Sequence, residues 1–303
     1  MAAALRNVLL LGGAGTVGPS IIKALLAKGT FKVSVLSRPD SRSTFPPDVA
    51  RLTSDFTASS LAKAFTGQDA IVDLLAQSSL DDRKKFIDTA AEAGAKRFIL
   101  SEYSGNMENK ANVSILPLFA ERVAVREYAK EKSDANPKFS FTALSNVPFY
   151  DWTIKNGFIG FNLETLTATI YGDGDQPSSM TTLSSVGQAI AGILSKPAET
   201  ANKGLFVASF TPTQNEILAT LEEITEKKWA INKISITDAI SQGFQALGNG
   251  DMSGFIGVLM GSTYGPENGN NFPENGGVSN KLLGLPKEDL KMVTKAVVEG
   301  KDV

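Results

Sequence analysis

A short apolar run, a string of glycines and an amphipathic segment follow one another near the start of the chain and constrain its fold most. Residues 8–11 are apolar, and Gly12, Gly13, Gly15 and Gly18 come after them. The run is too short to span a membrane and is typical of a buried strand. Apolar residues then recur at helical spacing, namely Val17, Ile21, Ile22, Leu25 and Leu26. This segment predicts a strand, a tight turn and a helix.

The spacing of the glycines points to a nucleotide-binding turn. Gly13, Gly15 and Gly18 satisfy G-x-G-x-x-G, and Gly12, Gly15 and Gly18 satisfy the looser G-x-x-G-x-x-G. Glycine permits a sharp turn and close contact between backbone and pyrophosphate, while the helix N-terminus presents N–H groups to the anion. The pattern favours a dinucleotide site over a purely structural turn. The residues expected to hold the dinucleotide are Gly12, Gly13, Gly15, Thr16, Val17 and Gly18.

Arg38 predicts which dinucleotide is bound. The alternating, β-branched residues 31–36 predict a second, parallel strand, and Arg38 lies just beyond it. An acidic residue at this place binds the ribose 2′-hydroxyl of NAD, whereas an arginine accommodates the 2′-phosphate of NADP. Asp40 is a rival ribose ligand, and Arg42 offers a second cation. We expect NADP(H); the alternative is that Arg38 is a solvated loop residue.

Strand and helix patterns alternate along the first half of the chain. The expected elements are strands at residues 49–52, 70–75 and 97–101 and helices at residues 59–65 and 81–93. This order predicts an α/β fold with a Rossmann-like, doubly wound parallel sheet. Leu75, Ala76 and Gln77 end an apolar strand at the carboxyl edge, where such sheets bind ligands, so we expect them to contact the cofactor.

Composition limits the chemistry that is available. The 303 residues carry a net charge of −2 and include neither cysteine nor histidine. Thiol nucleophiles, imidazole bases and ordinary zinc sites are therefore excluded, and no metal site is expected. Lys and Arg are scattered, which argues against nucleic acid or a membrane surface as partner. Because no signal segment is recognisable, we expect a cytoplasmic protein.

Several segments together resemble the isoflavone reductase and NmrA-like group of atypical short-chain dehydrogenases. The glycine string and Arg38 fit, as do residues 86–103, which read Phe-Ile-Asp-Thr-Ala-Ala-Glu-Ala-Gly-Ala-Lys-Arg-Phe-Ile-Leu-Ser-Glu-Tyr. Residues 141–149 resemble the sixth strand of the group and its exit. Residues 171–174, 186–187 and 202–204 are similar to its C-terminal part. The resemblance spans nearly the whole chain.

The resemblance implies that the chain has two parts with different functions. We expect an NADP-binding Rossmann domain over residues 1–150 and a smaller substrate-binding lobe over residues 151–303 that shares strands with it. The substrate implied is a small aromatic or polyketide-like metabolite. Ser145, Asn146 and Phe149, at the exit of the sixth strand, are expected beside the cofactor. The oligomeric state stays open.

Arg122 has two interpretations. In the reductases of the group, a lysine on the helix after the fifth strand serves catalysis, and Arg122 takes its place here. The tyrosine of ordinary short-chain dehydrogenases would fall at Leu118 and is missing. Position therefore suggests a catalytic cation. However, Arg122, Arg126 and Lys130 recur four residues apart, as on the solvated face of an amphipathic helix.

A proton source is needed because arginine stays protonated in proteins and cannot donate a proton. Tyr150, near the mouth of the sheet, or water is expected to supply it, and the Tyr150–Trp152 pair either packs or forms a substrate wall. Tyr128 and Lys132 fit Tyr-x-x-x-Lys by letter. Tyr128 points away from the helical face of Arg122, so we do not expect this pair to act.

Residues 248–277 are rich in Gly and Asn and show no clear period. Such a long irregular segment predicts either a mobile cover over the ligand or a disordered loop. We keep both possibilities.

Three functions are consistent with the sequence. The leading hypothesis is an NADPH-dependent reductase of a small aromatic or polyketide-like metabolite, with Arg122 stabilising the developing oxyanion. The second is an NmrA-like sensor or regulator that binds NADP(H) without turnover. The third is a non-redox isomerase or cyclase that reuses the pocket.

Overall fold

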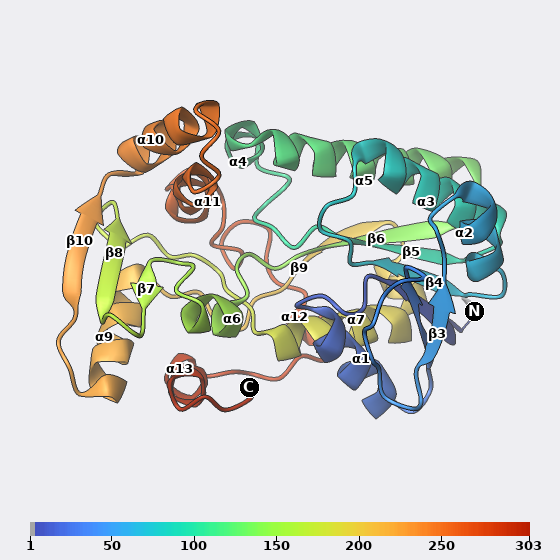
Figure 1. Cartoon of the computed structure of the whole chain (residues 1–303), viewed down its shortest axis with the longest axis horizontal. Coiled ribbons are helices and arrows are strands. Elements are labelled where there is room, and N and C mark those ends of the chain that lie inside the picture. Colours follow the sequence, from blue (N-terminus) through green and yellow to red (C-terminus); the bar gives the residue numbers. More distant parts are fainter. Residues whose placement is uncertain (1–3) are drawn as a thin grey trace.

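The computed structural model describes residues 4–303, and a seven-stranded parallel sheet forms its centre (Figure 1). The strand order is β3-β2-β1-β4-β5-β6-β9. These strands are β1 (Asn7–Leu11), β2 (Lys32–Ser37), β3 (Ala50–Thr53), β4 (Ala70–Asp73), β5 (Arg97–Ser101), β6 (Ser140–Ser145) and β9 (Lys203–Phe206). The order reverses between β1 and β4, so the predicted doubly wound, Rossmann-like sheet is confirmed.

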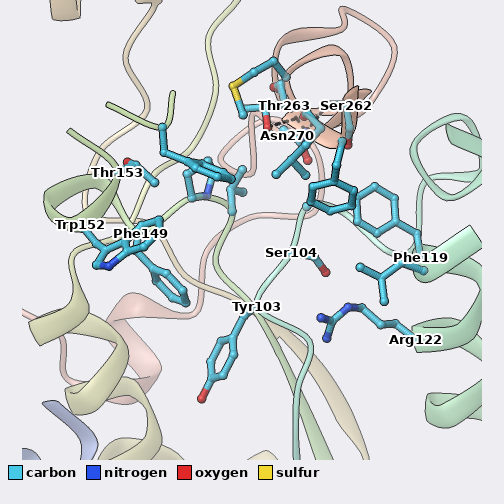
Figure 2. Close-up of a pocket in the computed structure, with 18 residues that line it drawn as sticks. Tyr103, Ser104, Phe119, Arg122, Phe149, Trp152, Thr153, Ser262, Thr263 and Asn270 are labelled. Carbon is cyan, nitrogen blue, oxygen red and sulfur yellow. Dashed lines mark hydrogen bonds between the residues drawn. The ribbon is translucent and has the colours of Figure 1, made fainter. Parts of the chain in front are cut away.

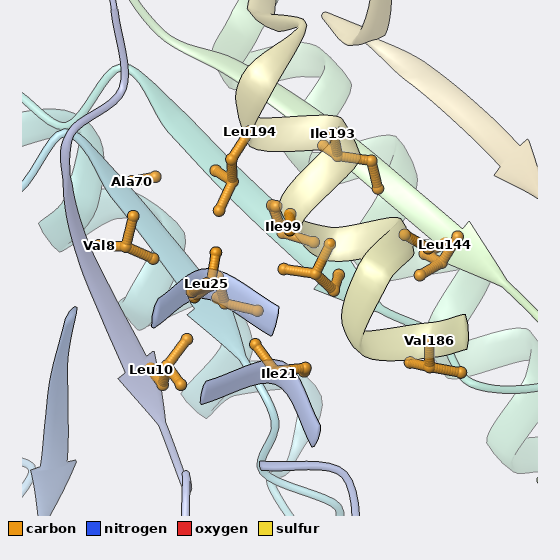
Figure 3. Packing of buried hydrophobic residues seen from close by; sticks show 14 of the residues in the cluster. Val8, Leu10, Ile21, Leu25, Ala70, Ile99, Leu144, Val186, Ile193 and Leu194 are labelled. Atoms are coloured by element: carbon orange, nitrogen blue, oxygen red, sulfur yellow. The ribbon is translucent and has the colours of Figure 1, made fainter. Parts of the chain in front are cut away.

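Both faces of the sheet are buried, because helices cover each of them. Successive residues of a strand point to opposite faces and so join different clusters. Val8 and Leu10 of β1 join one core cluster (Figure 3), whereas Leu9 and Leu11 join another. The first cluster is covered by α1 (Gly18–Ala27), α7 (Leu183–Ser195) and α12 (Asn280–Leu283). The second is covered by α2 (Ala58–Phe65), α3 (Leu80–Glu92) and α5 (Pro117–Ala135). The continuous apolar strands of the sequence follow from this double burial.

A three-stranded sheet and its helices lie beside the carboxyl edge of the main sheet (Figure 1). Its strand order is β10-β8-β7. The strands are β7 (Phe161–Asn162), β8 (Thr167–Tyr171) and β10 (Ala230–Ile234). The remaining helices are α4 (Lys110–Ile115), α6 (Tyr150–Lys155), α8 (Pro197–Thr200), α9 (Gln214–Thr225), α10 (Ile236–Gly248), α11 (Gly254–Tyr264) and α13 (Leu290–Val298).

The chain beyond residue 150 also contributes to the main sheet. Strand β9 pairs in parallel with β6. Helix α7 packs so closely on α1 that a Cβ atom at Gly187 would lie 2.3 Å from the carbonyl oxygen of Ser20. The two lobes of the chain therefore share one core.

Of the two predictions for residues 248–277, the disordered loop is wrong, whereas the mobile cover over the ligand stays a prediction. Helix α11 occupies much of this segment, and Asn268 and Asn270 beyond the helix are buried. The glycines serve close packing: a Cβ atom at Gly254 would lie 2.3 Å from the carbonyl oxygen of Gly243 in α10. A glycine-rich composition thus reflects contact between two helices instead of disorder.

Two kinds of feature are absent from residues 4–303. None of these helices is both long and apolar enough to cross a membrane. Nor do three Asp or Glu side chains gather as a metal site requires. The residues that are candidates for a functional site lie along the carboxyl edge of the main sheet.

Candidate active site

The carboxyl ends of neighbouring strands bring the candidate residues into one row. The glycine turn follows β1, which lies between β2 and β4 at the point where the strand order reverses. Arg38 follows β2 on one side, and a cavity lies at the ends of β5 and β6 on the other. An extended ligand with its phosphates at the turn would therefore reach Arg38 with one end and the cavity with the other.

Three of the four glycines in the turn are required by the protein itself. Gly12 has a φ of +85°, which favours glycine. A Cβ atom at Gly13 would lie 2.8 Å from the Val35 side chain, and one at Gly18 would lie 1.9 Å from the carbonyl oxygen of Gly13. At Gly15 the nearest atom would be 3.5 Å away, and this residue is exposed. The absence of a side chain at Gly15 thus leaves space on the solvent side, where a phosphate would approach.

The N-terminus of α1 fits an anion. Its N-cap is Val17, whose buried side chain cannot accept a hydrogen bond from the first turn. Ala14 and Thr16 are exposed, as is Gly15 between them. Within the turn, the N–H groups of Gly15 and Gly18 donate to the carbonyl oxygens of Gly12 and Gly15 at 3.1 and 3.2 Å. The turn therefore presents the exposed residues 14–16 and the positive end of a ten-residue helix to solvent, and these fit a dinucleotide phosphate.

Two exposed arginines lie beyond β2. Arg38 makes a long ion pair with Asp40, at 4.0 Å, and both side chains are largely exposed. Arg42 is exposed as well. Arg51 of β3 donates to the carbonyl oxygen of Ser41 at 2.5 Å and thereby fixes the loop that carries both cations. The sequence did not predict this role of Arg51, because only the folded chain brings Arg51 close to the loop that carries Arg38 and Arg42.

The segment after β4 is held by a buried ion pair. Asp73 and Arg83 bind one another, and Arg83 donates to the carbonyl oxygen of Leu75 at 2.6 Å. Burial raises the pKa of Asp73, and the charge of Arg83 opposes this. Leu75 is half-buried, whereas Ala76 and Gln77 are exposed at the edge of the sheet. All three lie beside the glycine turn, because β4 neighbours β1.

A cavity of about 240 Å³ lies at the ends of β5 and β6 (Figure 2). Its walls are mainly apolar and include six aromatic side chains, namely Tyr103, Phe119, Phe149, Trp152, Phe158 and Phe255. Residues from α5, α6, α11 and the exits of both strands contribute to it. The arrangement fits a small, flat and largely apolar molecule.

Arg122 is the cation of this cavity. Its guanidinium projects from α5 toward the cavity (Figure 2). Burial and the charge of Arg83 lower its pKa, while Glu102 and Asp73 oppose this. Arg126, one turn later, is likewise only half-buried, and it binds the buried Glu102 through Nε at 2.8 Å. Of the supposed solvated stripe, only Lys130 is largely exposed, so Arg122 belongs to the cavity.

Of the three residues expected at the exit of β6, only Phe149 lines the cavity. Its ring lies 5.6 Å from that of Tyr103, edge to face. Ser145 is buried and donates to Glu102 at 3.1 Å, and the amide of Asn146 donates to the carbonyl oxygen of Val147 at 2.9 Å. The side chains of Ser145 and Asn146 do not line the cavity, and the Oδ1 atom of Asn146 is buried without a hydrogen-bond partner among residues 4–303. Contact of Ser145, Asn146 and Phe149 with the cofactor stays a prediction.

The assignment of Tyr150 as proton source is wrong. Its side chain is fully buried, and its hydroxyl hydrogen-bonds to Thr294 at 2.6 Å. The ring packs edge to face on Phe210, and burial raises the pKa of the hydroxyl. Helix α6 begins at Tyr150 and directs it into the core beside the three-stranded sheet, which includes Phe161 and Ile170, whereas Trp152 lines the cavity.

Tyr128 lies away from the cavity as expected. Its hydroxyl donates to Asp88 at 2.7 Å, and Lys132 pairs with the same carboxylate at 2.8 Å. The Tyr-x-x-x-Lys spacing therefore belongs to a surface ion pair between α5 and α3.

Two residues of the cavity have a backbone conformation that is rare outside glycine. Tyr103 has a φ of 41° and Val147 a φ of 56°, and they follow β5 and β6 respectively. The N–H of Val147 donates to the carbonyl oxygen of Ser104 at 3.0 Å, which ties the two exits together. Such strain costs stability and concentrates at functional sites. Nothing in the sequence marks these two positions.

Comparison with known proteins agrees with this geometry. Oxidoreductase poxI of Penicillium oxalicum is 31% identical over 236 residues, which cover 78% of this chain and 75% of that protein. Oxidoreductase aprR of Aspergillus flavus is 29% identical over 297 residues, or 97% of this chain and 99% of the relative.

The fold and the family are equally clear. A solved structure described as AtPrR2 with NADP+ and (+)pinoresinol has a TM-score of 0.76 at 20% identity, and covers 98% of this chain and 100% of that one. The NmrA-like family matches residues 5–248 of the chain. The resemblance seen in the sequence is thereby confirmed, and the chain belongs to the NmrA-like family.

Proposed function

We propose that the protein is an NADPH-dependent reductase of a small aromatic or polyketide-like metabolite. One observation carries this proposal: a half-buried arginine, Arg122, faces an apolar cavity with aromatic side chains on the same sheet edge as the glycine turn. Two relatives are named oxidoreductases, and AtPrR2 was solved with NADP+ and an aromatic compound, which supports the proposal.

Different residues of the sheet edge would bind different parts of the cofactor. The turn from Gly12 to Gly18 would hold the pyrophosphate, and Arg38, with Arg42, the 2′-phosphate. Leu75, Ala76 and Gln77 would flank it on the side of β4. When bound, NADPH supplies a hydride. The cavity at β5 and β6 would hold the molecule that accepts it.

Arg122 would stabilise the charge that reduction creates. When a hydride adds to an aryl ketone or enone, an electron pair moves onto the carbonyl oxygen. A fixed cation in a site that excludes water stabilises this oxyanion strongly. Because arginine keeps its proton, the proton that completes the product would come from water.

The test is a scan of NADPH absorbance against aromatic ketones and enones, repeated with NADPH deuterated at C4 of the nicotinamide. We expect oxidation of NADPH with at least one compound and deuterium at the reduced carbon. Conversion of a compound without consumption of NADPH would instead indicate an isomerase or cyclase.

A second candidate function is an NADP(H) sensor. Arg122 favours it, because the reductases that the sequence resembles carry a lysine at this place. For a sensor we expect calorimetric binding of NADPH without its oxidation by any compound in the panel.

A further inference from the structure

Ser104 is held rigidly at the edge of the cavity. It follows β5, and its carbonyl oxygen accepts the N–H of Val147 at 3.0 Å. The next residue, Gly105, lies so close to Asn270 that a Cβ atom would be 2.5 Å from its Oδ1 atom. With the backbone held on both sides, the Cβ atom of Ser104 stays at the edge of the cavity, where its hydroxyl lies (Figure 2).

The Ser104 hydroxyl is buried and has no hydrogen-bond partner within the described part of the chain. The other serine, threonine and asparagine side chains of the cavity are engaged with protein groups. Thr153 donates to the carbonyl oxygen of Tyr150, Thr263 to that of Leu259, Ser262 to the Asn112 side chain, and Asn270 to the carbonyl oxygen of Ser262. A buried hydroxyl without a partner destabilises the protein, so its presence calls for a ligand that uses it.

Ser104 and Arg122 line the same cavity, and in Figure 2 the hydroxyl and the guanidinium face the same space. Around them the walls are apolar and aromatic. A molecule bound there thus meets a cation and a free hydroxyl beside one another. A single oxygen atom on a flat, apolar molecule is the simplest partner for both.

We propose that the Ser104 hydroxyl donates a hydrogen bond to the carbonyl oxygen of an aromatic ketone or enone, beside Arg122, and selects such compounds over their hydrocarbon analogues. The inference rests on the proposed function, in which Arg122 stabilises charge on that oxygen. Ser104 would orient the carbonyl without giving up its proton. A site with a fixed donor rejects analogues that leave the donor unpaired.

The test compares two ligands of the same shape, 1-tetralone and tetralin, which differ in the carbonyl oxygen. Calorimetric titration should show that the wild-type protein binds 1-tetralone more tightly. In Ser104→Ala we expect about a tenfold loss of affinity for 1-tetralone, the scale of one hydrogen bond, and no loss for tetralin. The melting temperature should stay equal or rise, because the removed hydroxyl has no partner in the protein.

Thr263→Val is the matched control. Its hydroxyl lies in the same cavity but already donates to the carbonyl oxygen of Leu259 at 2.9 Å, so the preference for the ketone should persist. Equal affinity of wild type and Ser104→Ala for 1-tetralone, absence of binding to both included, overturns the inference. So does a lower melting temperature of Ser104→Ala, which would show a structural role. Because these readouts need no hydride transfer, they are separate from a failure of the reductase assay.

Discussion

The glycine turn and the cavity lie on one sheet edge but are built in opposite ways. The turn consists of consecutive residues, is exposed, and obtains its shape from backbone contacts such as that between Gly18 and Gly13. The cavity combines segments around residues 103–105, 118–122, 147–158 and 255–270. A local motif can therefore be recognised in the sequence, whereas a site assembled by tertiary contacts cannot.

The long-range hydrogen bonds around the cavity show how it is assembled. The Asn270 side chain accepts from the N–H of Asn106 at 2.9 Å and donates to the carbonyl oxygen of Ser262 at 2.8 Å. Ser262 in turn donates to Asn112 at 2.5 Å. The contacts of Asn270 with Asn106 and of Ser262 with Asn112 join residues more than 100 positions apart. Substitutions in the turn and in the cavity should therefore have separate effects.

Gly18→Ala and Gly15→Val should separate structure from binding within the turn. At Gly18 a Cβ atom would lie 1.9 Å from a carbonyl oxygen, so we expect a loss of more than about 3 kcal/mol in the free energy of unfolding. Gly15→Val should keep native circular dichroism and lose NADPH binding in calorimetry. Undiminished binding by Gly15→Val would mean that the turn holds no phosphate.

Arg122→Met should affect the cavity and spare the turn. We expect turnover to fall by roughly 2.7 to 4 kcal/mol, or about a hundred- to a thousandfold, because one oxyanion partner is lost. NADPH affinity should stay within a few-fold. Steady-state rates and calorimetry measure the two effects. Wild-type turnover in this variant would refute the catalytic assignment.

Arg38→Ala should affect only one end of the cofactor. Loss of a charge-assisted contact with the 2′-phosphate costs roughly 1.5 to 3 kcal/mol, so NADPH binding should weaken about ten- to a hundredfold. NADH binding should hardly change. If both cofactors lose affinity equally, Arg38 does not recognise the phosphate.

Asp69→Asn changes the opposite edge of the sheet and should leave both sites intact. Burial alone would raise the pKa of Asp69, but hydrogen bonds from the N–H groups of Asn7 and Arg6 and from Lys96 outweigh it and lower the pKa. The ionised carboxylate of Asp69 therefore makes its whole contribution to the free energy of unfolding at pH values above the ordinary pKa of 3.8. This contribution is lost as the pH falls through the lower pKa of the folded state.

We expect Asp69→Asn to unfold more easily at pH 7, by about 1 kcal/mol, and to approach the wild type in acid. Urea titrations at several pH values measure this difference. A constant difference at every pH would contradict the role of the charge, and altered NADPH affinity would contradict the separation of the two edges.

The sequence predicted the elements of the main sheet because their patterns are local. Residues 97–101, for example, were expected as a strand and form β5. Helical periodicity misled at Arg122 and Arg126, because an ion pair with Glu102 and a cavity can bury charged residues that look solvated. The glycines of residues 248–277 suggested flexibility, since the sequence does not show that a second helix lies against them.

The outward or inward direction of single side chains was the hardest to predict. Tyr150 and Trp152 are two residues apart, and Tyr150 enters the core beside the three-stranded sheet while Trp152 lines the cavity. Ser104 was not singled out at all. Its unpaired hydroxyl becomes recognisable only when every neighbouring polar group has been placed.

The shared core has a consequence for how the chain matures during translation. Val8 and Leu10 emerge first from the ribosome, but they pack in a cluster with Val186 and Ile190 of α7 and Leu205 of β9. Until those residues are synthesised, one face of the nascent sheet stays uncovered and is a target for chaperones. The glycine turn, although it precedes these residues in the chain, is therefore backed by a complete core only after α7 and β9 have been made.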